Sequence, residues 1–260
     1  MNVLVTGGSG VVGSQVVRAL RETGHRAVVL SRRGESGEDW RRGDLATGEG
    51  LNEAVAGMEA IVHAGSATTD LTKQRETDVE GTQRLLEAAH AAGAGHLVYI
   101  SIVGMEGVAY PYYRSKLAAE AIVKEGLVPW TILRSTQFHT LMELFLGFFA
   151  RVPAVMPVPY RWRFQPVDQR EVGTRLAEIA TKPPAGLLPD FGGPEVRDFK
   201  SIAESWRRAR GLTRPMLHLP LPFKFSRQFA AGRLLCPDHR DGKVTFEQYL
   251  DRKYPDRSAK

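Results

Sequence analysis

The sequence contains a single cysteine, Cys236, and this scarcity excludes two kinds of framework. One thiol cannot form an intramolecular disulfide, and it cannot supply the thiolates of a cysteine-rich zinc site. The seven histidines show no H-E-x-x-H or similar spacing, so the sequence predicts no metal site. There is also no G-x-S-x-G motif, which argues against a serine hydrolase.

Long apolar runs are missing as well. A membrane-spanning helix needs about 18 uninterrupted apolar residues, and the nearest approach, Leu141–Val158, is broken by Glu143, Arg151 and prolines. The N-terminus has no basic leader, so we expect no signal peptide, no membrane contact and a cytoplasmic location. With 260 residues, 43% of them hydrophobic and 25% charged, the composition is that of a globular protein.

The net charge of +6 comes from the C-terminal part of the chain. Residues 197–260 contain 15 Lys and Arg against 7 Asp and Glu, a net of +8, and the rest of the chain therefore carries −2. Such a bias is compatible with a solvated surface, an anionic substrate or nucleic acid. Because the basic residues are scattered and not interleaved with aromatic residues, we favour the solvated surface over a nucleic-acid partner.

Short apolar segments alternate with helical patterns through the first half of the chain. Strands are expected near 2–6, 26–30, 58–64, 96–101 and 130–134, and helices near 11–23, 77–92 and 113–125. This alternation predicts the α/β class, with a doubly wound parallel sheet covered by helices on both faces. We assign 1–135 to this core. We assign 136–260, with helices near 138–150, 168–181, 199–210 and 222–235, to a small C-terminal cap from which 164–181 returns to the core.

A glycine-rich turn joins the first strand to the first helix, with the spacing G-x-x-G-x-x-G. Gly7 permits the tight turn, Gly10 lets the backbone approach a pyrophosphate, and Gly13 lets the helix pack close to the strand. The free N–H groups and the positive dipole end of the helix favour phosphate binding. We therefore expect a dinucleotide there, also contacted by Ser9, Val11 and Val12.

The end of the second strand indicates which dinucleotide. An NAD site normally carries Asp or Glu at this place for the ribose hydroxyls, but this sequence has Ser31, Arg32 and Arg33. A guanidinium can pair with a 2′-phosphate through two hydrogen bonds. The sequence therefore predicts NADP, with NADPH preferred over NADH.

Two further segments are candidates for contact with the same ligand. Asp44, followed by Leu45, stands where a third strand ends; its carboxylate could accept from the adenine amino group, or it could cap a turn. The small residues Ala64, Gly65 and Ser66 end the fourth strand and leave room for the cofactor backbone.

Together these segments resemble the short-chain dehydrogenase/reductase superfamily, which has a Rossmann core, and specifically its atypical or extended branch related to NmrA-like proteins. The resemblance covers most of the chain. It is carried by the glycine loop, by Gly43-Asp44-Leu45 and by His63-Ala64-Gly65. It continues through Asp78-Val79-Glu80-Gly81-Thr82, Tyr99-Ile100-Ser101-Ile102-Val103-Gly104, Tyr112-Tyr113-Arg114-Ser115-Lys116, Leu133-Arg134-Ser135-Thr136-Gln137-Phe138 and Phe164-Gln165-Pro166-Val167-Asp168.

The resemblance implies catalytic roles for three residues. Tyr112 and Lys116 form Y-x-x-x-K, one helical turn apart. Tyr112 would be the general acid, and the ammonium of Lys116, with the positive charge of the nicotinamide, would lower its pKa; Lys116 would also hold the ribose. Ser101 would hydrogen-bond the substrate carbonyl. The Tyr112–Lys116 pair could alternatively bind only the ribose, or be structural.

The resemblance thus implies an NADP-dependent oxidoreductase that transfers hydride between nicotinamide and a small carbonyl, alcohol or activated alkene. Members that only sense NADP(H), and epimerases or lyases that retain the nicotinamide, are the alternatives. Gln137, Phe138 and His139 follow the sixth strand and are candidates for a substrate pocket, although His139 could be ordinary packing. Helices of this superfamily often form dimer contacts, which makes a homodimer one expected assembly.

Overall fold

The computed structural model describes residues 1–33, 37–68, 70 and 72–255. Within it the chain forms two compact units. Unit 1 contains 1–101, 110–134 and 170–189, and unit 2 contains 102–109, 135–169 and 190–260. The second unit is therefore built from three separate stretches of chain. The segment that rejoins unit 1 is 170–189, somewhat later than the 164–181 expected from the sequence.

Unit 1 is a seven-stranded sheet in the order β3-β2-β1-β4-β5-β6-β9. The neighbours of β1 run parallel to it, with Val3 opposite both Ala27 and Ala60. This order confirms the predicted doubly wound sheet. Strands β2 and β3 are added on one side of β1, and β4 and the later strands are added on its other side. The strands are β1 (Asn2–Thr6), β2 (Arg26–Ser31), β3 (Trp40–Arg42), β4 (Ala60–His63), β5 (His96–Ile102), β6 (Trp130–Ser135) and β9 (Gly186–Leu187).

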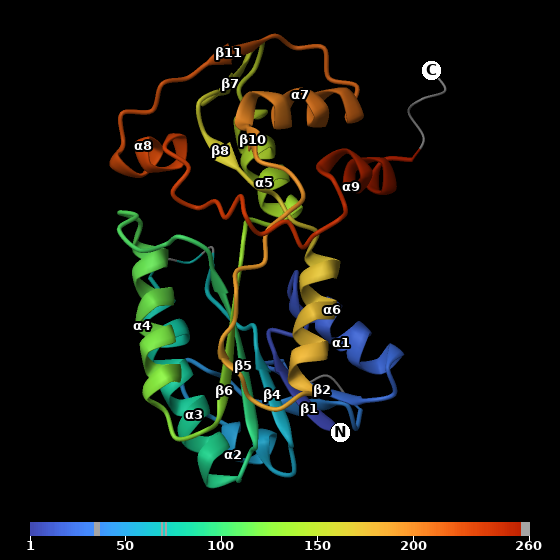
Figure 1. The fold of residues 1–260 in the computed structure, drawn as a ribbon, viewed down its shortest axis with the longest axis vertical. Helices are drawn as coiled ribbons and strands as arrows, with labels where there is room; N and C mark the ends of the chain where they lie inside the picture. Colours follow the sequence, from blue (N-terminus) through green and yellow to red (C-terminus); the bar gives the residue numbers. More distant parts are fainter. Residues whose placement is uncertain (34–36, 69, 71, 256–260) are drawn as a thin grey trace. The chain divides into compact units, whose positions relative to one another are not determined.

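Helices cover both faces of this sheet. Figure 1 shows α1 (Gly13–Glu22) and α6 (Gln169–Ala180) on one side, and α2 (Leu51–Val55), α3 (Gly81–Ala91) and α4 (Pro111–Glu125) on the other. Strand β4 is buried along its whole length, as expected for a parallel strand with helices on both faces. Leu85, Leu97 and Ile132 are completely buried in the core beneath α3 and α4, and each such side chain contributes about 1.5–3 kcal/mol.

Two helical predictions needed correction. The helix expected near 77–92 is a π-helical turn, η1 (Arg75–Glu80), followed by α3, and the turn brings Asp78 into the interior with 2% exposure. The helix expected near 222–235 is only α8 (Lys224–Ala230). Its shortness has a local cause, because Pro222 lacks an N–H group and Gly232 takes the left-handed φ of 72°.

Unit 2 contains four helices and two small sheets among its described residues. The antiparallel pair joins β8 (Arg163–Phe164) to β10 (Arg197–Asp198), and the parallel pair joins β7 (Met156–Val158) to β11 (Met216–His218). The helices are α5 (His139–Phe149), α7 (Phe199–Ala209), α8 and α9 (Phe246–Lys253). No helix in the described part of the chain is long and apolar enough to cross a membrane.

Aromatic rings form the interior of unit 2. The ring centroids of Trp162 and Phe229 are 5.2 Å apart, and those of Phe164 and Phe199 are 5.4 Å apart, both in edge-to-face geometry. Such pairs are worth about 0.5–1.5 kcal/mol beyond the area that they bury. The indole of Trp162 also donates to the Ser226 hydroxyl at 2.7 Å, which satisfies its only polar group.

Glu143 of α5 fastens helix α9 to the rest of unit 2. Its carboxylate accepts from the indole of Trp206 at 3.2 Å, from the Tyr254 hydroxyl at 2.6 Å, and from Tyr249 and Lys253. Burial alone would raise the pKa of Glu143, but donation from Lys253, Tyr249 and Tyr254 outweighs burial and lowers it. The four donors therefore favour the ionised form.

We expect Glu143→Gln to destabilise unit 2 by about 2–4 kcal/mol, because an amide NH₂ would face donors that now reach a carboxylate. Since folding lowers this pKa, the carboxylate stabilises the protein above the ordinary pKa of a glutamate, and the contribution is lost as the pH falls through the lowered value. The difference between variant and parent should therefore shrink in acid. Urea denaturation followed by tryptophan fluorescence at several pH values measures it.

Glu204→Gln is the matched control, because Glu204 belongs to an exposed pair with Lys200 on α7. We expect this variant to stay within about 0.5 kcal/mol of the parent. Equal stability of both variants at neutral pH would contradict the role of Glu143.

Candidate active site

The glycine turn between β1 and α1 packs so closely against neighbouring backbone that a side chain would not fit at two of its glycines. Gly7 has the left-handed φ of 65°, and a Cβ there would lie 2.7 Å from the Ala64 carbonyl oxygen. A Cβ on Gly13 would lie 2.1 Å from the Gly7 carbonyl oxygen. The turn therefore packs directly on the segment after β4 and on the first turn of α1. This is the crevice at the carboxyl ends of β1 and β4, where open α/β sheets bind their ligands.

Gly10 is different, because it is exposed and its added Cβ would meet only the Gly7 carbonyl oxygen, at 3.0 Å. Ser9 and Val11 are exposed beside it, whereas Val12 is buried. Within the described residues, no side chain caps the N-terminus of α1, so its first N–H groups have no side-chain acceptor. This exposed backbone fits the pyrophosphate of a dinucleotide.

The end of β2 presents the predicted cationic pair. The backbone N–H of Arg33 donates to the Ser31 hydroxyl at 3.3 Å, which forms a small turn. The side chains of Arg32 and Arg33 are exposed, and neither makes an ion pair with a described residue. Residues 34–36, which follow, lie outside the described part of the chain. The contact of Arg32 and Arg33 with a 2′-phosphate stays a prediction.

Asp44 and Leu45 lie after β3, close to the segment after β4. The Asp44 carboxylate accepts from the backbone N–H of Ala46 at 2.9 Å, so it holds a turn in the protein alone. Leu45 is 8% exposed, and one of its methyl groups would lie 2.9 Å from a Cβ on Gly65. The turn that was weighed as an alternative is thus present, and contact of Asp44 with adenine stays a prediction.

His63 ties the glycine turn to its surroundings. Its Nδ1 lies 2.7 Å from the Thr6 hydroxyl and its Nε2 lies 2.9 Å from the Thr82 hydroxyl, and Thr6 also accepts from the Gly65 N–H at 3.0 Å. Burial, followed by the charge of Lys116, lowers the pKa of His63 to about 3, so the ring is neutral. The sequence analysis gave His63 no role of its own; a histidine ending an otherwise apolar strand is the signal that could have found it.

Lys116 lies on the inner face of α4 with 4% exposure. Its ammonium donates to the Ile100 carbonyl oxygen at 2.8 Å and stands 4.0 Å above the centre of the Tyr99 ring. Burial lowers the pKa of Lys116 to about 8, and the charges of Asp78 and Glu120 partly oppose this. The structure thus holds the Lys116 ammonium in the interior at a fixed carbonyl, and Tyr112 lies one helical turn earlier on α4.

The Tyr112 hydroxyl lies 3.3 Å from the Ser66 hydroxyl. Burial raises the pKa of Tyr112, and the charge of Asp78 raises it further, whereas the hydrogen bond with Ser66 lowers it. In the protein alone, burial therefore keeps the phenol protonated. The expected lowering of this pKa involves the nicotinamide charge and stays a prediction.

Ser101 is buried in β5 with 1% exposure, and its hydroxyl hydrogen-bonds Glu120. Glu120 lies one turn beyond Lys116 on α4 and pairs with Arg134 through two hydrogen bonds of 2.8 and 2.7 Å. In the protein alone, Ser101 thus belongs to a buried polar cluster behind Lys116. Its contact with a substrate carbonyl stays a prediction.

Asp78 is the buried acid that the sequence analysis did not assign. It lies on η1 and accepts from the Ser66 hydroxyl through one oxygen and from the Ala67 N–H, at 3.0 Å, through the other. The structure thereby brings Ser66, Tyr112 and Asp78 together from three segments. Asp78 stands between Glu76 and Glu80, so the local sequence did not distinguish it from its neighbours, and its one signal was its place in the segment Asp78–Thr82 that resembles the superfamily.

Gln137 and His139, predicted for a substrate pocket, are buried in unit 2. The Gln137 amide donates to the Leu234 carbonyl oxygen at 2.9 Å, and His139 Nε2 donates to the Val244 carbonyl oxygen at 3.0 Å. Burial lowers the pKa of His139 to about 4. Phe138 is half-buried at the start of α5. The first two side chains have packing partners, and the assignment of all three to a substrate pocket stays a prediction.

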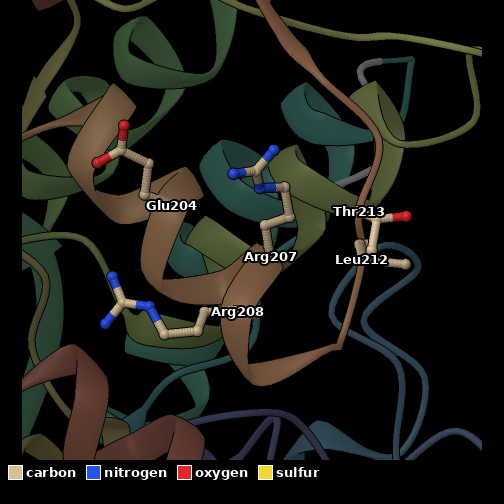
Figure 2. A pocket seen from close by; sticks show the side chains of 5 residues that line it. All are labelled: Glu204, Arg207, Arg208, Leu212 and Thr213. Carbon is tan, nitrogen blue, oxygen red and sulfur yellow. The ribbon is translucent and has the colours of Figure 1, made fainter.

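A pocket of about 470 Å³ lies on unit 2, and none of the predicted site residues lines it. Figure 2 shows Glu204, Arg207 and Arg208 on α7, with Leu212 and Thr213 on the segment that follows. Arg207 already donates to the Arg214 carbonyl oxygen at 2.8 Å. Because the pocket contains none of the groups described above, we do not place cofactor chemistry there. The described residues contain no cluster of acids, histidines and cysteines that could hold a metal ion.

Comparison with solved structures identifies the class of fold. A short-chain dehydrogenase/reductase superfamily protein from Agrobacterium tumefaciens with bound NAD has a TM-score of 0.74 at 21% identity, covering 99% of this chain and 97% of that chain. A UDP-glucose 4-epimerase from Stenotrophomonas maltophila with bound NAD has a TM-score of 0.76 at 15% identity, covering 98% and 97%. The fold is therefore that of the predicted superfamily.

Residues 7–140 match the NAD(P)H-binding family, and the chain belongs to that family. A ceramide reductase of Caulobacter vibrioides is 27% identical over 217 residues, which cover 78% of this chain and 67% of that protein. A 2-alkyl-3-oxoalkanoate reductase of Stenotrophomonas maltophilia is 36% identical over 109 residues, covering 39% and 33%. The photosystem II assembly factor Ycf39 of Synechocystis is 30% identical over 159 residues, covering 58% and 48%. The chain thus matches between a third and two thirds of the length of these relatives.

We expect Gly10→Ala to fold normally and to bind NADPH at least tenfold more weakly. The added methyl would point into the exposed space beside the α1 N-terminus and would need only a small adjustment of the Gly7 carbonyl. Calorimetric titration with NADPH measures the affinity, and circular dichroism checks the fold. Gly95→Ala is the control, because its Cβ would be 3.6 Å from the nearest atom, and it should bind as the parent does. Unchanged affinity of the Gly10 variant would contradict this placement of the pyrophosphate.

Proposed function

We propose that this protein is an NADPH-dependent oxidoreductase that transfers hydride between nicotinamide and a carbonyl, alcohol or activated alkene of a small, fairly apolar substrate. The observation that carries the proposal is the buried ammonium of Lys116, fixed at the Ile100 carbonyl one helical turn from Tyr112. A buried cation costs free energy, and its place one helical turn from Tyr112 gives that cost a chemical use in this proposal.

NADPH, when bound, supplies the hydride that a substrate carbonyl carbon accepts. Tyr112 donates its phenolic proton to the carbonyl oxygen, and the phenol's electron pair stays on Tyr112 as a phenolate. The ammonium of Lys116 stabilises that phenolate and binds the ribose hydroxyls. Ser101 hydrogen-bonds the same carbonyl oxygen, and the exposed backbone of the glycine turn binds the pyrophosphate. For substrate contact we keep Gln137, Phe138 and His139 as the candidates that the sequence alone indicates.

The preference for NADPH rests on the exposed guanidiniums of Arg32 and Arg33 at the end of β2. An Asp or Glu at this place would repel a 2′-phosphate, whereas two cations without an ion pair in the described structure attract it. Asp44 accepts from the adenine amino group in this arrangement.

The relatives' names support carbonyl reduction. Two of them are called reductases, and one of these is named for a 2-alkyl-3-oxoalkanoate, which contains an oxo group. A second candidate function is NADP(H) sensing without turnover, and its support is that one relative is named an assembly factor and not a reductase. The two candidates differ in whether NADPH is consumed.

Arg32→Ala should lower the affinity for NADPH by about 10–100-fold and leave the affinity for NADH nearly unchanged, because it removes hydrogen bonds to a phosphate that only NADPH carries. Calorimetric titration with both nucleotides measures this. Arg18→Ala, which removes another exposed guanidinium on α1, is the control and should change neither affinity. Equal affinities of the parent for NADPH and NADH would contradict the role of Arg32.

Tyr112→Phe should reduce the turnover of any accepted substrate by about 100-fold or more, with little change in NADPH affinity, because the ring remains and only the proton donor is lost. The measurement is NADPH oxidation with a panel of apolar ketones, aldehydes and enones. Tyr110→Phe is the matched control, because Tyr110 precedes α4 and lies off the face that carries Lys116. Tight NADPH binding with no turnover of the panel would favour sensing, and interconversion of a substrate without net NADPH loss would favour an epimerase or lyase.

A further inference from the structure

Three polar side chains of unit 1 form a chain of hydrogen bonds that ends at Tyr112. Ser66 follows β4, Asp78 lies on η1 and Tyr112 lies in the first turn of α4. The Ser66 hydroxyl hydrogen-bonds both the Asp78 carboxylate and, at 3.3 Å, the Tyr112 hydroxyl. The sequence analysis assigned Ser66 only to cofactor contact, and it gave Asp78 no role.

The number of available hydrogens limits which of these hydrogen bonds can form at the same time. Both oxygens of Asp78 accept, one from Ser66 and the other from the Ala67 N–H at 3.0 Å. A serine hydroxyl has one hydrogen, and here Asp78 receives it. Because one hydrogen cannot serve two acceptors fully, the Ser66 hydroxyl can turn to the Tyr112 oxygen, 3.3 Å away, only by leaving Asp78.

We propose that Ser66 is a positioning residue for Tyr112. Once Tyr112 has given up its proton, the hydroxyl hydrogen of Ser66 turns from Asp78 to the phenolate oxygen of Tyr112. This inference rests on the proposed function, because it requires Tyr112 to act as an acid. The phenolic O–H bond breaks, the proton goes to the substrate oxygen, and the electron pair remains on Tyr112. The Ser66 O–H bond only rotates, so no further reactant is needed.

The surroundings explain why a phenolate here needs such a donor. Burial and the nearby Asp78 both oppose negative charge on Tyr112, and the hydrogen bond with Ser66 favours it. Lys116, one turn along α4, is the buried cation of that helix, which also carries Arg114 and Lys124. The titratable groups around Tyr112 are Asp78 on η1, Tyr99 on β5, Tyr110 before α4, and Tyr113 and Lys116 on α4.

Asp78 acts on the same phenol in two opposite ways. Its carboxylate fixes Ser66 and Ala67, which places the hydroxyl beside Tyr112. Its charge also disfavours the phenolate. Removal of the hydroxyl and removal of the charge should therefore move the pKa of Tyr112 in opposite directions. A side chain that only supported the fold would not produce such a pair of shifts.

The test uses full-length protein labelled with a fluorinated tyrosine, whose phenol titrates at lower pH than tyrosine. Fluorine NMR follows the pKa of residue 112 without cofactor, and Tyr112→Phe identifies its signal. Ser66→Ala should raise this pKa by about one to two pH units, the equivalent of a hydrogen bond to a charged group. Ser66→Thr keeps the hydroxyl and should restore the parent value. Asp78→Asn should lower the pKa. The signals of Tyr110 and Tyr113 should move much less.

The proposal would be overturned if Ser66→Ala left the pKa of Tyr112 unchanged. It would also be overturned if Ser66→Thr gave Tyr112 the same pKa as Ser66→Ala does. Weakened NADPH binding in Ser66→Ala with an unmoved phenol would also overturn it, because Ser66 would then be a cofactor contact. The expected kinetic result is a lower kcat for Ser66→Ala, an alkaline shift of the pH profile and an unchanged Kd for NADPH. Failure of the proposed function would appear separately, as full turnover by Tyr112→Phe.

Discussion

Unit 1 is organised around the close approach of two backbone segments at the ends of β1 and β4. Side chains at Gly7 or Gly13 would collide with backbone atoms within 3 Å, so this approach exists only because those positions lack a Cβ. The neutral ring of His63, held between Thr6 and Thr82, fixes the same junction from below. The positions of the α1 N-terminus and of the segment carrying Ser66 both follow from this contact.

A second constraint is the interior of unit 1 beneath α4, where a core otherwise made of leucine, isoleucine and valine also contains charge. Lys116 is buried against a carbonyl and an aromatic ring, with Asp78 and Glu120 as its acidic neighbours. Such groups stabilise a fold less than apolar side chains of the same size would, and leaving one of them unpaired costs several kcal/mol. Tyr112, Lys116 and Glu120 follow one another at intervals of four residues along α4, and the proposed function assigns a chemical use to that face.

Unit 2 is held together by different forces and carries a different share of the function. Its core is aromatic, and its last helix is fastened through Glu143 rather than through a sheet. The family match covers residues 7–140, so most of unit 2 lies beyond it. NAD(P)H binding therefore follows from family membership, whereas the family match identifies no substrate.

The local sequence alone determined the parallel sheet, the glycine turn and the i, i+4 relation of Tyr112 to Lys116, because these depend on apolar periodicity, on glycine conformation and on helical repeat. Tertiary structure decided what each polar group contacts. Asp44 holds a turn, Ser101 bonds Glu120, and Gln137 and His139 pack inside unit 2. The link between Ser66, Asp78 and Tyr112 joins residues up to 46 positions apart. Hydrogen bonds of that kind depend on three-dimensional distance and on a count of donors, and neither can be read from spacing along the chain.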